Sequence, residues 1–247
     1  MSTTTTSNNK PKLRLWVLSW GLFPRRVTIY LEEKGISDDF DVIPVNIGAD
    51  GKMNSPPGKP NGTLPLLEIA PPSNDEATPG KYVYQSIAIL EYIEEMYAGR
   101  GPSMLGATPE ERAQSRDLLT VLDEAVAFLT CYSHHASGIY APLVVPQSPE
   151  TARIALDRAH KVLSLLETMS CCDGPYLVTS KQPMIVDCVA MATIQFYANV
   201  YGVDLASEKH PRLARMYEAF YGRESAKWDA VVVPQGMVEV AKRMSVK

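Results

Sequence analysis

The stretch that decides the fold is KPNGTLPLLE, residues 59–68. Within it, Leu64-Pro65 follows a glycine turn and precedes a short apolar run, a setting in which the peptide bond before proline can be held cis. In unfolded chains this bond is cis in only about 10–30% of molecules, so the fold would have to lock it. A cis turn would direct the backbone N–H and C=O of Leu64 outward, where an extended peptide could pair with them as an added strand. The alternative is an ordinary trans proline that opens a strand.

The segments on either side of this stretch predict a compact α/β unit over residues 13–98. Pro24 suits the first position of a helix that Gly35 ends. Pro44 lies inside a predicted strand, which places that strand at a sheet edge because proline has no N–H to donate. The predicted order is strand, helix, strand, strand, strand and helix, at residues 13–19, 24–34, 40–47, 66–69, 81–84 and 86–97.

Strand-like runs nearly vanish beyond residue 98. Residues 99–108 contain glycines and a proline and predict a linker. Thr108, Pro109 and Glu111 then have the spacing of a capping box, and helical apolar periodicity continues toward the C-terminus. We therefore predict an all-helical domain over residues 109–247, and we predict that residues 1–12, which are polar and threonine-rich, form a disordered tail.

Composition narrows the class of protein. Of the 247 residues 45% are apolar, which is enough for a sizeable core, and no run approaches the ~18 apolar residues of a membrane span. The net charge is −4 and basic residues are scattered, so we expect neither nucleic acid nor membrane as a partner. The start does not have the form of a signal peptide. The cysteines lack a C-x-x-C spacing and predict reduced thiols in the cytoplasm; they are Cys131, Cys171, Cys172 and Cys188.

Several motifs together resemble the glutathione S-transferase family. In chain order they are PRRV at 24–27, LEEKG at 31–35, GTLP at 62–65 and QSIAI at 85–89. The resemblance implies a thioredoxin-like α/β N-terminal domain followed by an all-α bundle, glutathione as cosubstrate, and a homodimer. It implies a glutathione transferase or a glutathione-dependent isomerase acting on an apolar electrophile. The variant SWG at 19–21 with FPRR at 23–26 is similar to fungal members that tailor secondary metabolites.

The same resemblance assigns the glutathione-binding residues. Gln85 and Ser86 open a helix, whose free N–H groups and positive dipole end favour a carboxylate by about 0.3–1 kcal/mol, so they would hold the γ-glutamyl carboxylate. Ser86 could also simply cap that helix. Leu64, kept in place by Pro65, would pair with the cysteinyl backbone. Two further residues complete the set: Phe23, and Lys59, which could reach the glycyl carboxylate or remain a solvated loop lysine.

Activation of the glutathione thiol requires a donor near sulfur. Lowering a thiol pKa of about 8.5 by ~2 units requires roughly 2.7 kcal/mol of preferential stabilisation of the thiolate. Ser19 is the sole hydroxyl between the first strand and the first helical turn, so it is the candidate catalytic donor. The places where the family usually has its active hydroxyl or thiol hold Gly21, Leu22 and Phe23. Ser19 could therefore be an ordinary strand-end serine, with backbone N–H groups acting in its place.

The second substrate should lie between the domains, against the first long C-terminal helix. Tyr132 and His135 are our candidates for its pocket, within a polar cluster that also holds Cys131, His134, Ser137 and Tyr140. We expect no metal site there, because adjacent histidines point to different helix faces and a fourth ligand is missing. Asp187 is expected to be a buried capping residue with an incomplete cap, since Met184 stands where a serine or threonine is usual.

Two classes of function remain open. No cysteine lies between Ser19 and Val27, which disfavours thiol–disulfide exchange and leaves conjugation or isomerisation through a glutathione thiolate. The alternative is a non-catalytic protein that uses this fold for binding or assembly.

Overall fold

The computed structural model describes residues 12–48, 53–70, 80–170, 173–179, 181–228 and 233–242. Apart from Lys12, the predicted N-terminal tail lies outside this range, as do Cys171 and Cys172. None of the helices described combines the length and apolar character needed to cross a membrane.

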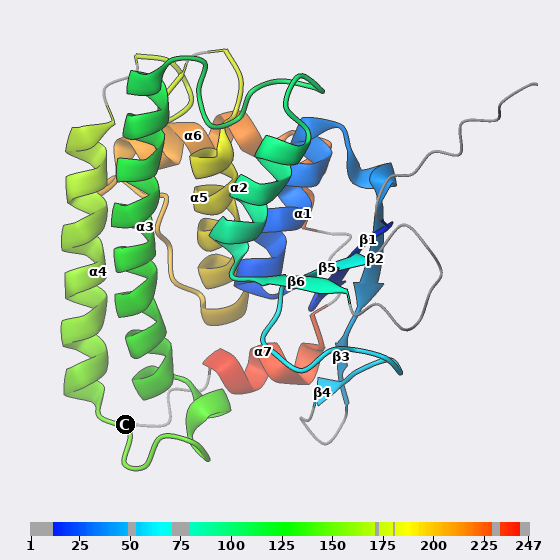
Figure 1. Cartoon of the computed structure of the whole chain (residues 1–247). Coiled ribbons are helices and arrows are strands. Elements are labelled where there is room, and N and C mark those ends of the chain that lie inside the picture. Colours follow the sequence, from blue (N-terminus) through cyan, green and yellow to red (C-terminus); the bar gives the residue numbers. More distant parts are fainter. Residues whose placement is uncertain are drawn as a thin grey trace, which may run out of the picture.

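The N-terminal unit is a four-stranded mixed sheet with two helices. The strand order is β2-β1-β5-β6, in which β1 runs parallel to β2 and antiparallel to β5, and β6 runs antiparallel to β5. Figure 1 shows both helices between the sheet and the C-terminal helices. This confirms the predicted thioredoxin-like α/β class and the edge position of the strand that contains Pro44. The elements are β1 (Lys12–Val17), α1 (Leu22–Lys34), β2 (Phe40–Pro44), β5 (Leu66–Ala70), β6 (Lys81–Tyr84) and α2 (Ser86–Met96).

Among the boundaries that differ from the sequence expectation, two involve a proline. The segment predicted as one strand over 40–47 is divided, because Pro44 cannot continue the ladder. Asn46–Ile47 (β3) instead pairs with Met53–Asn54 (β4) as a separate small sheet. Helix α1 begins at Leu22, with Gly21 as its N-cap, so that Pro24 lies within the first turn and not at its first position. Proline is tolerated there because first-turn N–H groups have no partner in the helix.

The C-terminal part is all-helical, as predicted. The capping box at its start is confirmed, since Thr108 Oγ1 accepts the N–H of Glu111 at 3.2 Å and the Glu111 carboxylate accepts the N–H of Thr108 at 3.4 Å. Short 3-10 turns cover Ser37–Asp39 (η1), Gly138–Tyr140 (η2) and Glu224–Ala226 (η4), and a π-helical turn covers Tyr197–Tyr201 (η3). The helices are α3 (Pro109–Ala136), α4 (Pro149–Met169), α5 (Ile185–Phe196), α6 (Pro211–Tyr221) and α7 (Gln235–Lys242).

Asp187 is buried at the start of α5. Its carboxylate accepts the N–H of Met184 at 2.8 Å and that of Leu177 at 2.9 Å, which is the capping role expected of it. Burial raises its pKa to about 7 in spite of these donors. The carboxylate therefore joins the loop before α5 to the helix itself.

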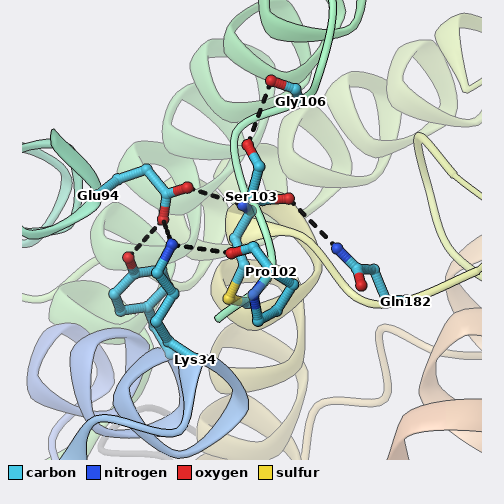
Figure 2. A network of polar contacts seen from close by, with 8 residues as sticks. Lys34, Glu94, Pro102, Ser103, Gly106 and Gln182 are labelled. Atoms are coloured by element: carbon cyan, nitrogen blue, oxygen red, sulfur yellow. Dashed lines mark hydrogen bonds and ion pairs between the residues drawn. The ribbon is translucent and has the colours of Figure 1, made fainter. Parts of the chain in front are cut away.

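The proposed linker, residues 99–108, is held by a buried polar network (Figure 2). Lys34 at the end of α1 donates to Glu94 on α2 at 2.9 Å and to the carbonyl oxygen of Pro102 at 2.8 Å. Gln182 donates to the carbonyl oxygen of Ser103 at 3.3 Å from the other side. These bonds fix the N-terminal helices and the loop before α5 to the same segment of chain.

Candidate active site

The sheet register brings together the chain segments that the sequence singled out. Trp16 pairs with Leu66, and Leu66 pairs with Tyr84. The turn after β1, the Leu64-Pro65 segment before β5 and the Gln85-Ser86 segment after β6 therefore lie side by side at one end of the sheet. The Leu64–Pro65 peptide bond is cis, which was the first of the two alternatives.

The N-terminus of α2 offers unpaired backbone donors. Gln85 is its N-cap, and the first bond within the helix runs from Ile89 N–H to the Gln85 carbonyl oxygen at 3.0 Å. The N–H groups of the first turn are therefore without helical acceptors, and neither a capping side chain nor a first-turn acid neutralises them. Gln85 has φ 66° and is, among the described residues, the one non-glycine with a positive φ. Such a conformation costs on the order of 1–3 kcal/mol and is typical of ligand-binding positions.

Arg26 on α1 lies beside these donors. Its side chain is almost fully buried, with a relative exposure of 1%, and it crosses the ring of Phe23 at 4.8 Å. One nitrogen, Nη1, donates to Asp123 Oδ1 at 2.7 Å and to Ser86 Oγ at 3.4 Å. Within the described part of the chain, Nε and Nη2 have no partner. Burial lowers the pKa of Arg26 and the Asp123 carboxylate opposes this shift. The guanidinium stays charged because arginine does not lose its proton in proteins.

A cavity of about 480 Å³ contains these groups. Free helix amides border it, together with the ion pair of Arg26 and the half-exposed Asp123 carboxylate. This arrangement matches an α-amino acid group, whose carboxylate needs donors and whose ammonium needs an acceptor. The cavity is lined by Phe23, Arg26, Gln85, Ser86, Ile87, Asp123, Val126, Ala127 and Thr130.

A second, mostly apolar cavity of about 290 Å³ adjoins the first and shares Phe23 and Thr130 with it. It lies between the start of α1, the end of α3, the end of α5 and α7. Its lining is aromatic and aliphatic with several hydroxyl groups: Leu18, Trp20, Gly21, Leu22, Phe23, Ile47, Thr130, Ser133, Ile139, Tyr140, Phe196, Tyr197, Tyr201 and Met237.

Ser19 is exposed and is not among the residues that line either cavity. Its neighbours Gly21, Leu22 and Phe23 line the apolar cavity instead. The first bond of α1 runs from Arg25 N–H to the Gly21 carbonyl oxygen at 3.0 Å, which leaves the N–H groups of Leu22 and Phe23 without a helical acceptor. The first turn contains no acidic residue. Of the two alternatives for a thiolate donor, the geometry therefore favours the backbone amides.

Lys59 and Leu64 lie on the loop side of the site. The Lys59 ammonium donates to the carbonyl oxygens of Pro60 at 2.9 Å and Gly62 at 3.1 Å, so it is held by its own loop. Leu64 is half-buried against Trp16 and lies before the first paired residue of β5. Its backbone is thus placed at the start of the strand and outside the ladder.

Tyr132 and His135, our sequence candidates for the second pocket, do not line it. His135 Nδ1 accepts the N–H of Ser148 at the start of α4, at 3.2 Å. Because α3 stays helical through Ala136, residues 130 and 133 share a face that turns away from residues 132 and 135. Tyr140, a member of the same predicted cluster, does line this cavity. In the part of the chain that the structure describes, no group of three or more acidic, histidine or cysteine side chains could hold a metal ion.

Arg26 and Asp123 were not identified as site residues from the sequence. They lie 97 positions apart, so their contact could not be seen in local patterns. One signal was available in the sequence: Arg25 and Arg26 are adjacent near the start of a helix whose apolar residues pack into the core.

Comparison with known proteins agrees with this picture. Residues 20–96 match the family model "Glutathione S-transferase, N-terminal domain". The chain is 32% identical over 102 residues to glutathione S-transferase F9 of Arabidopsis thaliana, covering 40% of this chain and 41% of that protein. It is 35% identical over 101 residues to maleylacetoacetate isomerase of Pseudomonas aeruginosa, covering 39% and 42%. The chain thus spans about two fifths of these curated relatives.

Solved structures extend the likeness to the whole fold. A glutathione S-transferase domain-containing protein of Marinobacter aquaeolei VT8 superposes with a TM-score of 0.66 at 24% identity, over 87% of this chain and 100% of that one. Maleylacetoacetate isomerase of Anaeromyxobacter dehalogenans 2CP-1, solved with bound glutathione, gives 0.64 at 21% identity, over 89% and 94%. The chain therefore has the glutathione S-transferase fold, as the sequence resemblance implied.

Proposed function

We propose that this chain, which carries a glutathione S-transferase N-terminal domain, binds glutathione and uses the glutathione thiolate as a nucleophile. The observation that carries this proposal is the cavity at the start of α2, where the free first-turn amides lie beside the ion pair of the buried Arg26 with the half-exposed Asp123 carboxylate. The amides suit the carboxylate of a zwitterionic γ-glutamyl group, and Asp123 suits its ammonium.

The pose follows from the positions of these groups. The γ-glutamyl carboxylate is held by the Gln85-Ser86 segment with Arg26, and its ammonium by Asp123. The cysteinyl backbone pairs with Leu64 next to Pro65, and Lys59 is within the loop that the glycyl end approaches. Sulfur then lies near Phe23, where the two cavities meet. The proposal keeps the binding set predicted from the sequence and adds Arg26 and Asp123 to it.

Thiolate formation is assigned to the first turn of α1. Hydrogen bonds to a charged partner contribute about 1.5–3 kcal/mol each, so the N–H groups of Leu22 and Phe23 can supply the roughly 2.7 kcal/mol that a 2-unit shift of the thiol pKa requires. On this proposal Ser19→Ala leaves turnover within about twofold of wild type. A loss of a hundredfold or more would restore Ser19 as the catalytic donor.

The activated thiolate supports two reactions. One is conjugation to an apolar electrophile, and the other is reversible addition that isomerises a double bond, as the name of the related maleylacetoacetate isomerase suggests. A role in fungal secondary metabolism rests on the motif at 19–26 alone. We place the reaction in the cytoplasm, where glutathione is reduced. A non-catalytic binding protein remains the second candidate, and it would bind glutathione without turnover.

We also propose a homodimer through the β6 edge and α3. β6 is a sheet edge, and Tyr82 and Tyr84 on it are 39% and 40% exposed. Unpaired edges with exposed aromatic side chains are suited to an interface. Light scattering should give twice the chain mass, and Tyr82→Glu should give monomers. A monomeric wild-type protein would refute this arrangement.

Isothermal titration calorimetry with glutathione tests the proposed function. Ser86→Ala removes the hydroxyl that Arg26 contacts, and we expect it to weaken binding about three- to tenfold, since a neutral hydrogen bond contributes about 0.5–1.5 kcal/mol. Ser115→Ala is the matched control, because Ser115 is also buried on a helix but lies outside both cavities. Equal affinities of the two variants would contradict the assigned carboxylate site.

A further inference from the structure

The loop of residues 59–64 carries a lysine that is bonded to the loop itself. The Lys59 ammonium donates to the carbonyl oxygens of Pro60 at 2.9 Å and of Gly62 at 3.1 Å. The backbone N–H of Lys59 donates to the carbonyl oxygen of Pro56 at 3.3 Å. One charged side chain thus ties together the loop that leads to the Leu64–Pro65 bond.

An aromatic ring packs against the same loop from strand β6. Gly62 has φ +138°, and a Cβ added to it would lie 2.6 Å from Cε1 and 3.1 Å from Cδ1 of Tyr84. Glycine both leaves room for this ring and adopts this backbone conformation without strain. The Tyr84 ring therefore fixes the position of Gly62 relative to the sheet.

Tyr84 also connects the two chain segments that the glutathione pose uses. It is the last residue of β6, pairs with Leu66 of β5 and directly precedes Gln85. Its main chain leads into the start of α2, while its side chain packs on the loop before Leu64. The position of one residue thus affects the spacing between the proposed contacts of the γ-glutamyl carboxylate and those of the cysteinyl backbone.

The backbone of Leu64 depends on such support. The ladder between β1 and β5 begins at Leu66, so it does not hold Leu64 in place. A loop that is ordered only when a ligand binds charges its lost conformational entropy against affinity, and a loop ordered beforehand avoids this cost. The contacts of Lys59 and Tyr84 provide that order.

We propose that Lys59 and Tyr84 are positioning residues of the glutathione site, which hold residues 59–64 in the conformation that presents the backbone of Leu64 to the cysteinyl group. This inference rests on the proposed function. It gives Lys59 a role other than contact with the glycyl carboxylate, because an ammonium that moved to the ligand would give up the two bonds that shape the loop.

Isothermal titration calorimetry with two ligands separates these roles of Lys59. The ligands are glutathione and its glycyl amide, in which a neutral amide replaces the carboxylate. The proteins are wild type, Lys59→Met, which keeps most of the aliphatic chain and removes the charge, and Lys81→Met. Lys81 is the matched control because it is an exposed lysine at the other end of β6.

We expect Lys59→Met to weaken the binding of both ligands by the same factor, about three- to thirtyfold, because the loop loses hydrogen bonds from a charged donor. Lys81→Met should bind both within about twofold of wild type. A loss at least about threefold larger for glutathione than for the amide would assign Lys59 to the glycyl carboxylate and overturn the proposal. Unchanged affinity of Lys59→Met for both ligands would also overturn it.

Tyr84 is tested by substitutions that keep or remove its ring. Tyr84→Phe keeps the contact with Gly62 and should bind glutathione within about twofold of wild type, whereas Tyr84→Leu should bind it about three- to tenfold more weakly. Tyr82→Leu is the control, because Tyr82 lies on the same face of β6 with nearly the same exposure, 39% against 40%, and pairs with Glu68. An effect on the dimer would be common to both leucine variants.

Equal affinities of Tyr84→Leu and Tyr82→Leu would overturn the role of Tyr84. A loss in Tyr84→Phe as large as that in Tyr84→Leu would overturn it too, because the ring contact would then not be what matters. Failure of the proposed function is distinct from all of these results, since it would appear as no binding of glutathione by the wild-type protein.

Discussion

Arg26 is the residue on which the site depends. A guanidinium at 1% exposure is costly to bury, and among the residues that the structure describes its Nε and Nη2 have no partner. Ser86 and Asp123 engage a single nitrogen, Nη1, and so fix the guanidinium beside the first turn of α2. Its positive charge adds to that of the helix N-terminus at the edge of the cavity.

Replacing Arg26 by methionine should weaken glutathione binding about 10- to 100-fold, because a hydrogen bond between charged groups contributes about 1.5–3 kcal/mol. Calorimetric titration measures this change directly. Arg153→Met is the control, since Arg153 is an exposed arginine on α4 that pairs with Asp157. An affinity within about twofold of wild type for Arg26→Met would rule out its contact with the ligand.

His210 gives the folded protein a pH dependence of its own. Burial lowers the pKa of His210, and together with the neighbouring ring of His160, at 2.9 Å between nitrogens, and with Lys209 it brings this pKa to about 4. Because the unfolded-state pKa is about 6.5, the unfolded chain binds more protons between pH 6.5 and 4. This contribution to stability is therefore full above pH 6.5 and is lost as the pH falls toward 4.

Urea denaturation at pH 7.5 and pH 5 should show this loss in the wild-type protein. His210→Gln should show a smaller fall in the free energy of unfolding between the two pH values. An identical fall in both proteins would exclude His210 as the source.

For single residues, the sequence was informative where the role of a residue depends on its immediate neighbours in the chain. Leu64-Pro65 and Gln85-Ser86 could be selected because each marks the junction of a turn with a strand or helix. Arg26 and Asp123 could not, because their importance comes from a contact across 97 positions. Their pairing is a property of the folded chain.

The linker element shows how backbone geometry fixes the two units. Lys34 and Glu94 form a buried ion pair, and the other oxygen of Glu94 accepts the N–H of Met104 at 2.8 Å. The segment passes so close to α1 that a Cβ at Gly101 would lie 2.5 Å from the carbonyl oxygen of Lys34. Gly101 has φ +69°, whereas Gly99, at φ +80°, has open space around it.

These two glycines form a matched pair for a stability test. Gly99→Ala should lower the free energy of unfolding by about 1–2 kcal/mol, from the left-handed backbone alone. Gly101→Ala should lose about 1–3 kcal/mol more, from the added steric conflict. Urea denaturation gives both values. Equal losses would show that the close approach to Lys34 does not constrain the linker.

Helix starts were predictable at the element scale because they are set by short motifs. Thr108 and Pro109 begin α3 as expected, and Ser148 and Pro149 have the same arrangement at the start of α4. It was harder to predict which side chains of a long helix face the cavity. The sequence placed Tyr132 and His135 on the cavity, whereas the face of α3 that reaches it carries Thr130 and Ser133.

At the scale of the whole molecule, the site depends on the packing of the N-terminal unit and the helical part into one shared core. Helix α1 packs against α5, and Arg223 binds Glu33 of α1 with two nitrogens, at 2.6 Å and 2.8 Å. Both cavities are lined by residues from the N-terminal unit and from the helical part. The class of each unit was readable from hydrophobic periodicity, but the cavity between them required the packed structure.

A crystal structure of the protein with glutathione tests the central claim most directly. We predict the γ-glutamyl carboxylate within hydrogen-bond distance of Arg26 and the first amides of α2, its ammonium at Asp123, and sulfur nearest the amides of Leu22 and Phe23. A tripeptide bound elsewhere, or a site still empty at saturating glutathione, would contradict the account.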